Sequence, residues 1–537
     1  MFRGHGATRL YPVHCFVAIL VPRWFLATPV PRYDGGRMNQ ARAQGWRTTK
    51  HTFLVVVFLG IVALSARSVS DPDVWWHLKT GQLIAQTRTV PHTDSFSFTR
   101  AGYPWVAHEW LTELFIYGIY RVSGWGGLIV VFALMVSATF FLVYLRSAPD
   151  PYSSGVIVLL GAWATAPVWG VRPQVVSLLL TALWFLILER SEQNSGLLWW
   201  TLPLTVLWVN LHAGFALGLA LLLLFLAGEI LEQFTSSRPS NSARLRALAI
   251  TFLFDLLLVP LNPNGVRMYL YPVDTLRSHA MPKYIVEWAS PNFHHAEYIP
   301  LLLLLLATTA VLAWSRLRVR PRDILLLMVS AFAALSSIRL IPFFVLVVVP
   351  FLSRPLQLWV RSGRFRDRDS ARGPLHYAGL LNALIVLALA GFVGFQINGV
   401  VHRQPQVEAQ RFPVGAVAYL QTHPHSAAGP LFNLYDWGGY LIWKLNPQTL
   451  VFIDGRADLY GESLMRQFAD TYDLKGDWQE PLQTWRIRTV LVNPDSALAV
   501  ALRHAPGWEV GYSDPQAVVL ERSAIPPPQR QQLLTAQ

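Results

Sequence analysis

Two aspartates, Asp71 and Asp73, stand at the end of the first long apolar run of the sequence, in the stretch SDPDVWWHLKTG. A carboxylate in this position could act as a general base or ligate a divalent metal ion. Acidic side chains oppose the dipole at a helix C-terminus, so they do not serve as caps there. Aspartate beside proline is also common in turns, so a turn and a reactive site both fit this stretch.

The segment that follows is rich in groups that could bind a ligand: Trp75, Trp76, His77, Lys79, His108 and Glu109. The two tryptophans could anchor the segment or stack on a ligand. Asp71, Asp73 and Asp94 could hold a divalent cation such as Mg²⁺ or Mn²⁺, although their spacing matches no metal-binding motif. Each of these residues alone is typical of a surface, but their concentration between two apolar runs is unusual.

A second set of ionisable residues lies within the apolar runs: Arg172, His212, Asp255 and Arg339. A charge at membrane depth costs ~2.5–3.5 kcal/mol and therefore usually lines a cavity or is paired. Arg172 and Arg339 could bind a phosphate, because the guanidinium fork suits it. The alternative interpretation is that both arginines mark helix ends at the membrane interface. Segment 262–296 adds Arg267, Lys283, Glu287 and His294, most of which fit ordinary loop residues.

Two motifs near the C-terminus also carry candidate residues. The motif YDWGGY contains Tyr435, Asp436 and Trp437, and its two glycines permit close approach of another chain segment. In FIDGRADLYG, Asp454 and Arg456 follow an expected strand, where ligands of α/β domains tend to bind. A strand-to-helix turn with a local ion pair explains the second motif equally well.

The composition indicates what must position these groups. Of 537 residues, 53% are hydrophobic and 14% charged, against about 25% charged in soluble proteins. Many apolar runs approach the ~20 residues that cross a bilayer. We therefore predict a polytopic α-helical membrane protein with about eleven spans: 52–69, 125–146, 153–169, 173–190, 197–211, 212–233, 247–261, 297–315, 323–337, 338–353 and 375–396.

The net charge of +13 does not indicate nucleic-acid binding, because the arginines gather in short loops between the apolar runs. With a cytoplasmic N-terminus, every strongly basic short loop falls on the cytoplasmic side, as the positive-inside rule requires. Segments 70–108 and 262–296 and the C-terminal region then lie outside. The single cysteine, Cys15, excludes an intramolecular disulfide framework and a cysteine-based metal site.

The ends of the chain differ from the apolar bulk. We expect residues 1–50 to be a disordered or mis-assigned extension, and residues 526–537 to be a disordered tail. Residues 397–525 alternate helix and strand patterns, which predicts a soluble α/β domain. Within it we expect helices at 412–423, 435–445 and 461–473 and strands at GPLFNL, TLVFID and TWRIRTVLVN, followed by a hairpin in WEVGYSDPQAVVLERS.

The acidic motif DPD after the first span, the large first outer loop and the C-terminal domain together resemble the GT-C superfamily of membrane glycosyltransferases. YDWGGY loosely resembles the WWDYG motif of oligosaccharyltransferases, with a changed order and one tryptophan fewer. The resemblance implies a polyprenyl-phosphate-linked sugar donor and an inverting transfer at the outer face of a bacterial inner membrane. Asp71 or Asp73 would then be the base, with Arg172, Arg339 or Lys79 near the phosphate and His212 in the binding site.

Two other functions remain open at this point. A transporter or flippase of a lipid-linked saccharide would explain the charges within the apolar runs, but transporters usually show inverted repeats, which this sequence lacks. A non-catalytic scaffold of GT-C shape would share every feature named above.

Overall fold

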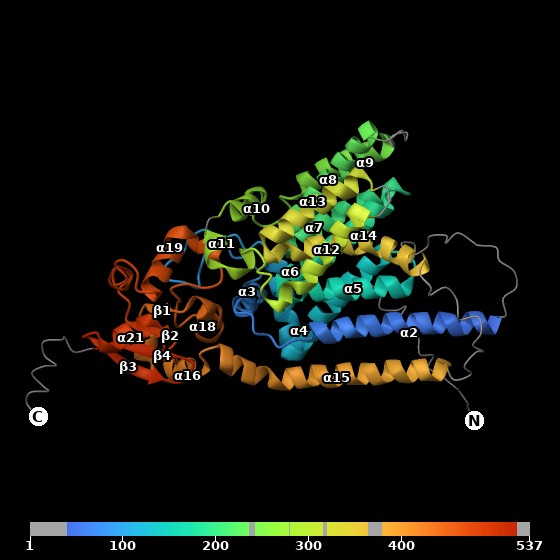
Figure 1. Ribbon diagram of the computed structural model, residues 1–537. Coiled ribbons are helices and arrows are strands. Elements are labelled where there is room, and N and C mark those ends of the chain that lie inside the picture. Colours follow the sequence, from blue (N-terminus) through green and yellow to red (C-terminus); the bar gives the residue numbers. More distant parts are fainter. Residues whose placement is uncertain (1–39, 236–241, 279, 315–318, 363–377, 524–537) are drawn as a thin grey trace, which may run out of the picture.

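The computed structural model describes residues 40–235, 242–278, 280–314, 319–362 and 378–523. Within them a bundle of apolar helices carries a smaller C-terminal domain at one end, and α3 lies near the junction of the two (Figure 1). The helices of the bundle are α2 (Gln40–Ser65), α4 (Trp110–Arg146), α5 (Pro151–Thr165), α6 (Pro173–Arg190), α7 (Thr201–Leu211), α8 (Phe215–Thr235), α9 (Ser242–Leu258), α12 (Ile299–Trp314), α13 (Pro321–Ser336), α14 (Ile341–Ser362) and α15 (Ala378–Arg411).

These helices make the chain a multi-pass membrane protein. Seven described helices are long and apolar enough to cross a membrane, and two shorter apolar helices accompany them at Thr49–Ser65 and Ser195–Leu211. Each of the eleven segments predicted as spans contains a helix in its described residues. Local sequence fixes several starts: proline occupies the first turn of α5, α6 and α13, where its missing N–H needs no partner. Asp150 caps α5 by accepting the Ser153 N–H at 2.9 Å.

The segment between the first two spans is folded against the bundle. It forms α3 (Val74–Thr87) and then a loop that leads into α4. α4 contains a break at Gly124, whose φ of 58° favours glycine, so an initial helix joins the span at that point. Gly81 lies within α3. A Cβ there would lie 2.2 Å from the Glu113 carbonyl oxygen, so glycine lets α3 touch the backbone of α4.

Short helices connect the remaining parts: α10 (Arg267–Arg277), α11 (Ala280–Tyr284) and the 3₁₀ turns η2 (Ala166–Val168), η3 (Ser195–Trp200), η4 (Val286–Trp288), η5 (Ala296–Tyr298) and η6 (Ile338–Leu340). Four of these turns, η2, η3, η5 and η6, each extend an apolar helix at one end. Segment 262–296, which contains α10, α11 and η4, therefore folds as short turns at the end of the bundle near the C-terminal domain (Figure 1).

The C-terminal domain is built on a four-stranded sheet of order β1-β2-β4-β3. Its strands are β1 (Leu431–Asn433), β2 (Thr489–Val492), β3 (Trp508–Ser513) and β4 (Val518–Arg522). The first pair is parallel and the other two are antiparallel. Its helices are α16 (Val414–Thr422), α17 (Pro424–Ala427), η8 (Tyr435–Trp437), α18 (Gly438–Leu445), α19 (Ala457–Tyr472), α20 (Glu480–Thr484) and α21 (Ala497–His504).

Three expectations need correction. TLVFID is not a full strand: Val451 makes isolated bridges to Leu431 and to Ser97 of the first loop. The edge of the sheet is therefore completed by residues from the distant loop 70–108, which local sequence cannot reveal. α15 also continues to Arg411, past the predicted boundary at 396. Finally, α2 already begins at Gln40, whereas residues 1–39 and the predicted tail 526–537 lie outside the described residues.

Candidate functional site

One guanidinium gathers three carboxylates at the end of the bundle beneath the C-terminal domain. Arg172 Nε lies 2.5 Å from Asp71 Oδ2, and Arg172 Nη2 donates to Asp73 Oδ2 at 3.0 Å. The Nη1 group pairs with Glu287. Three carboxylates therefore face one cation, and the cluster keeps a surplus of negative charge. These side chains are 13–28% exposed, so the cluster is open to a ligand.

Local structure explains how these groups meet. Asp71 Oδ1 accepts the Asp73 N–H at 2.9 Å, which fixes the turn that leads into α3. Arg172 is the extended residue before Pro173, the first residue of α6, so its side chain leaves the helix end freely. Glu287 lies in η4, in a segment where sequence reasoning favoured a loop role. Its position beside Arg172 depends on tertiary packing and has no signal in the local sequence.

Asp73 is the most perturbed acid of this cluster. Burial raises its pKa, and the charge of Asp71 raises it further, while Arg172 and His77 act in the opposite direction. Its Oδ1 also accepts the Trp76 indole N–H at 3.2 Å. A carboxyl group with a raised pKa is a better proton acceptor than an ordinary aspartate.

Arg339 differs from Arg172 in its partners. Within the described chain its guanidinium pairs with no carboxylate, and it lies over the Trp288 ring at 5.4 Å from the centroid. It interacts electrostatically with Arg172 and Asp73, so it belongs to the same region. Its turn, η6, is held there because Ile338 N–H donates to Ala289 O at 3.0 Å. Arg339 is thus available to an anion, whereas Arg172 is occupied.

Next to the carboxylates lies a buried cluster of histidines and glutamates. His77 Nδ1 is 3.4 Å from Glu109 Oε1 and 3.2 Å from Glu113 Oε1. His108 Nε2 lies 3.3 Å from the other carboxylate oxygen of Glu109, Oε2, and His212 Nε2 lies 3.8 Å from the same oxygen. Four of these residues were candidates from sequence, and the structure brings them together. Glu113 was missed, although its spacing of four residues from Glu109 places both on one helix face.

The charges in this cluster balance one another. Burial lowers the pKa values of His77 and His108, but Glu109 raises both, and the net shift is upward. Burial raises the pKa of Glu109, and the histidines more than reverse this shift, so the carboxyl stays ionised. Burial lowers the pKa of His212 to about 3, which keeps this imidazole neutral.

Comparisons with known proteins address the fold. No family model matches the sequence, and no curated protein matches it. Among solved structures, the oligosaccharyltransferase AglB from Archaeoglobus fulgidus, in complex with an inhibitory peptide and a dolichol-phosphate, is 10% identical. The match covers 90% of this chain and 75% of AglB, with a TM-score of 0.53. The chain has the GT-C fold.

Two other glycosyltransferases match over most of this chain with lower TM-scores. ArnT from Cupriavidus metallidurans, bound to undecaprenyl phosphate, is 14% identical over 90% of this chain and 99% of its own, with a TM-score of 0.46. The mycobacterial arabinofuranosyltransferase AftD is 15% identical over 92% of this chain and 40% of its own, with a TM-score of 0.45.

Several candidate residues from the sequence are packed against or hydrogen-bonded to other parts of the protein. Trp75 is 1% exposed and packs edge-on against Trp125, Phe412 and Tyr440, so it anchors α3. Trp76 is also buried. Lys79 Nζ donates to the Asn446 carbonyl at 2.9 Å, which ties α3 to the C-terminal domain. These contacts favour anchoring over ligand stacking or phosphate binding.

Asp94 does not join Asp71 and Asp73 in a metal site. Its carboxylate accepts the N–H groups of Phe96 and Ser97 and pairs with Arg456 at 2.8 Å. Arg456 also holds Asp454 at 2.7 Å. Asp94, Asp454 and Arg456 therefore join the first loop to the C-terminal domain of the GT-C fold. These contacts favour a structural ion-pair cluster over the metal-binding role predicted for Asp94 and the ligand-binding role predicted for Asp454 and Arg456.

The motif YDWGGY approaches the carboxylate cluster directly. A Cβ on Gly439 would lie 2.7 Å from the Pro72 carbonyl, so this glycine permits contact between α18 and the DPD turn. Asp71 acts electrostatically on Asp436, so the exposed Asp436 side chain lies near the cluster. Trp437 is different, because its indole N–H donates to Arg411 O at 3.1 Å within the core. Tyr435 and Asp436 thus stay candidates for acceptor contacts.

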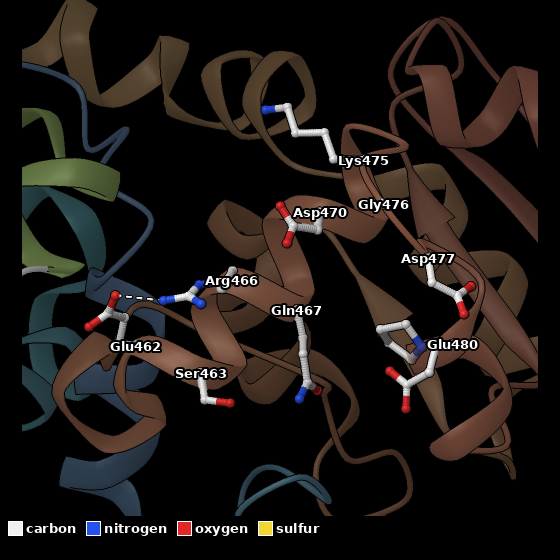
Figure 2. A pocket seen from close by; sticks show the side chains of 10 residues that line it. Glu462, Ser463, Arg466, Gln467, Asp470, Lys475, Gly476, Asp477 and Glu480 are labelled. Carbon is white, nitrogen blue, oxygen red and sulfur yellow. Dashed lines mark hydrogen bonds and ion pairs between the residues drawn. The ribbon is translucent and has the colours of Figure 1, made fainter.

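A surface cavity of about 440 Å³ lies elsewhere on the C-terminal domain (Figure 2). Its lining comes from α19 and the loop that follows, and includes Arg466, Asp470, Lys475 and Asp477. None of the residues predicted from sequence lines it, so it is separate from the carboxylate cluster.

Proposed function

We propose that the chain is a membrane glycosyltransferase that moves a sugar from a polyprenyl-phosphate donor to a lipid, glycan or protein acceptor. The observation that carries this proposal is the presence, within a GT-C fold, of an acid with a raised pKa near an arginine that pairs with no carboxylate of the described residues. These residues are Asp73 and Arg339. AglB, which shares the fold, was solved with a dolichol-phosphate, a lipid of the same class.

In this mechanism Asp73 accepts the proton of an acceptor hydroxyl. The acceptor oxygen forms a bond to the anomeric carbon as the bond from that carbon to the phosphate oxygen breaks. The polyprenyl phosphate leaves with both bonding electrons, and a single displacement inverts the anomeric configuration. Arg339 would stabilise the negative charge that develops on the phosphate, as donors aimed at a transition-state charge do. Arg172 positions Asp73, and Asp71 raises its pKa.

The residues present do not fit the divalent cation expected between Asp71 and Asp73. The facing oxygens of Asp71, Asp73 and Glu287 already contact Arg172, so a cation there would have to displace the guanidinium. Arg172 therefore supplies the positive charge at this position.

The proposal also sets the topology. The C-terminal domain and the DPD turn would lie outside the cytoplasm of a bacterial inner membrane, with the polyprenyl chain between the helices. A periplasmic reporter fused after residue 400 should be active, and one fused at residue 320 should be silent. The reverse pattern would overturn the proposed side of transfer.

Glycan and glycolipid profiling of a deletion strain tests the activity. Wild-type protein should restore a lost glycoconjugate, whereas Asp73→Asn should not. The exposed Asp495→Asn is the matched control and should restore it fully. Restoration by an equally abundant Asp73→Asn protein would contradict the proposal, as would a deletion strain with an unchanged profile.

A further inference from the structure

We propose that His77, Glu109 and Glu113 form a binding site for a transition-metal dication of the zinc type at the crossing of α3 and α4. This site is distinct from the Arg172 cluster, and the inference does not rest on the proposed transferase activity. The sequence did not predict this site, because Glu113 has no recognisable metal-binding motif around it.

The distances in the cluster match the separation of two ligand atoms on one metal ion. His77 Nδ1 lies 3.4 Å from Glu109 Oε1 and 3.2 Å from Glu113 Oε1. A charge-assisted hydrogen bond usually measures about 2.7–2.9 Å. Two ligand atoms on a tetrahedral zinc, each bound at roughly 2.0–2.1 Å, are separated by about 3.3–3.4 Å. The three ligand atoms all lie within 4.8 Å of one another, so one ion could contact all three.

Burial supplies a second and independent observation. His77, Glu109 and Glu113 are 2%, 5% and 0% exposed. The second carboxylate oxygen of Glu113, Oε2, is buried and has no hydrogen-bond partner in the described structure. An ionised carboxylate that is buried with an unfilled oxygen is costly, because no water replaces the lost hydration. A bound cation would give this oxygen a partner.

The neighbouring histidines behave as supports of Glu109. His212 Nδ1 accepts the Gly214 N–H at 3.0 Å and lies 2.7 Å from the Ser177 hydroxyl. Its proton must therefore reside on Nε2, which faces Glu109 and has no lone pair for a metal. His108 Nε2 holds the same oxygen of Glu109 at 3.3 Å. Metal-ligating carboxylates are commonly oriented by such surrounding hydrogen bonds.

The ligand types select the class of ion. One imidazole and two carboxylates suit zinc and similar first-row dications, whereas magnesium prefers oxygen ligands alone. Three protein ligands would also leave one position of a tetrahedral ion open to water.

The site would fix the position of the candidate base. His77 follows Asp73 by one turn of α3, and its N–H donates to the Asp73 carbonyl at 3.2 Å. Glu109 and Glu113 belong to the start of α4, which touches α3 at Gly81. A metal at this crossing joins the two helices directly beside Asp73.

Metal content of the purified full-length protein in detergent micelles tests the inference, with zinc as the probe. The wild-type protein should retain one equivalent of zinc after dialysis, and its zinc X-ray absorption spectrum should show imidazole scattering. Glu113→Gln and His77→Gln should each weaken zinc binding by at least about 100-fold, since even changes around a ligand cost 10–100-fold. The exposed residues Glu462 and His425 supply matched controls, and Glu462→Gln and His425→Gln should bind zinc as the wild type does.

The wild-type protein alone also decides the question if a variant fails to fold. Removal of zinc by a chelator should lower its Tm, and added zinc should restore it. A wild-type Tm that is indifferent to zinc, or bound zinc without imidazole scattering, would overturn the site. The cluster would then be held by a proton on His77 in place of the metal.

Discussion

Two arginines in this protein each pair with more than one carboxylate, and they differ in what surrounds them. Arg456 is 1% exposed, and its partners Asp94 and Asp454 are fully buried. Asp94 Oδ2 accepts from the N–H and O–H groups of Ser97, and the Tyr460 hydroxyl donates to the Asp454 oxygen that Arg456 Nη2 also contacts. The partners of Arg172 are instead 13–28% exposed, so water or a ligand can reach them.

The same ion-pair chemistry therefore serves two purposes in this protein. A fully satisfied cluster in the interior fixes one arrangement of the first loop against the C-terminal domain. A partly exposed cluster with surplus negative charge keeps a group ready to react. Asp73 is such a group, because Asp71 and burial raise its pKa while the cluster stays open.

The largest effect is expected on the transfer rate, when the reactive acid of the open cluster is replaced. Asp73→Asn should lower the transfer rate by about 10²–10⁴-fold, since a positioned general base contributes that much. Its Tm should stay near that of the wild type, because Asn keeps the shape of the turn. Rates measured with purified protein and a polyprenyl-phosphate-linked sugar check this; a rate within threefold of wild type, on the order of 0.6 kcal/mol, would remove Asp73 from the mechanism.

Breaking the buried cluster should instead affect folding. Arg456→Met leaves Asp94 and Asp454 without their cation and should cost about 3–5 kcal/mol of unfolding free energy. The same change at Arg172 should cost less, because water can reach its three partners. Denaturation of both variants in micelles measures the difference, and equal losses would show that exposure does not separate the two clusters.

The free arginine should control donor binding. Arg339→Met should weaken the binding of polyprenyl phosphate by about 1.5–3 kcal/mol, the usual contribution of a hydrogen bond to a charged group. The control is Arg466→Met, an exposed arginine of the C-terminal domain that should leave affinity unchanged. Binding of a fluorescent polyprenyl phosphate provides the measurement, and unchanged affinity in Arg339→Met would place the phosphate elsewhere.

The smallest effect concerns pH. Because the pKa of Asp73 is raised, the base form is lost as pH falls through that raised pKa, above the usual range of an aspartate. Asp71→Asn removes one cause of the shift, so the acid limb of the pH–rate profile should move to lower pH. The measured quantity is the pH at the midpoint of the acid limb, which does not depend on the absolute rate. A limb that stays in place or moves upward would mean that Asp71 does not act on the base.

The sequence predicts much of this architecture because apolar runs and basic loops are local signals. Each expected span contains a helix in its described residues, the first loop is structured, and a small sheet lies in the C-terminal region. The GT-C fold was expected from the same features.

The long-range pairing of charged groups could not be predicted in this way. The ion pair of Asp454 with Arg456 is local, but only tertiary packing brings Asp71 to Arg172 and Asp94 to Arg456. Val451 looks like part of a strand, but its partner is Ser97 of a distant loop. Gly81 looks like a helix breaker until α4 is placed against it.

The central claim is that the open cluster and Arg339 receive a polyprenyl-phosphate donor. A cryo-electron microscopy structure of Asp73→Asn with bound polyprenyl phosphate tests it most directly, since the acceptor need not be known. We predict phosphate density against the Arg339 guanidinium, within reach of residue 73, with the lipid chain between the helices. Phosphate density away from both residues, or a lipid bound only at the outer surface of the bundle, would contradict the account.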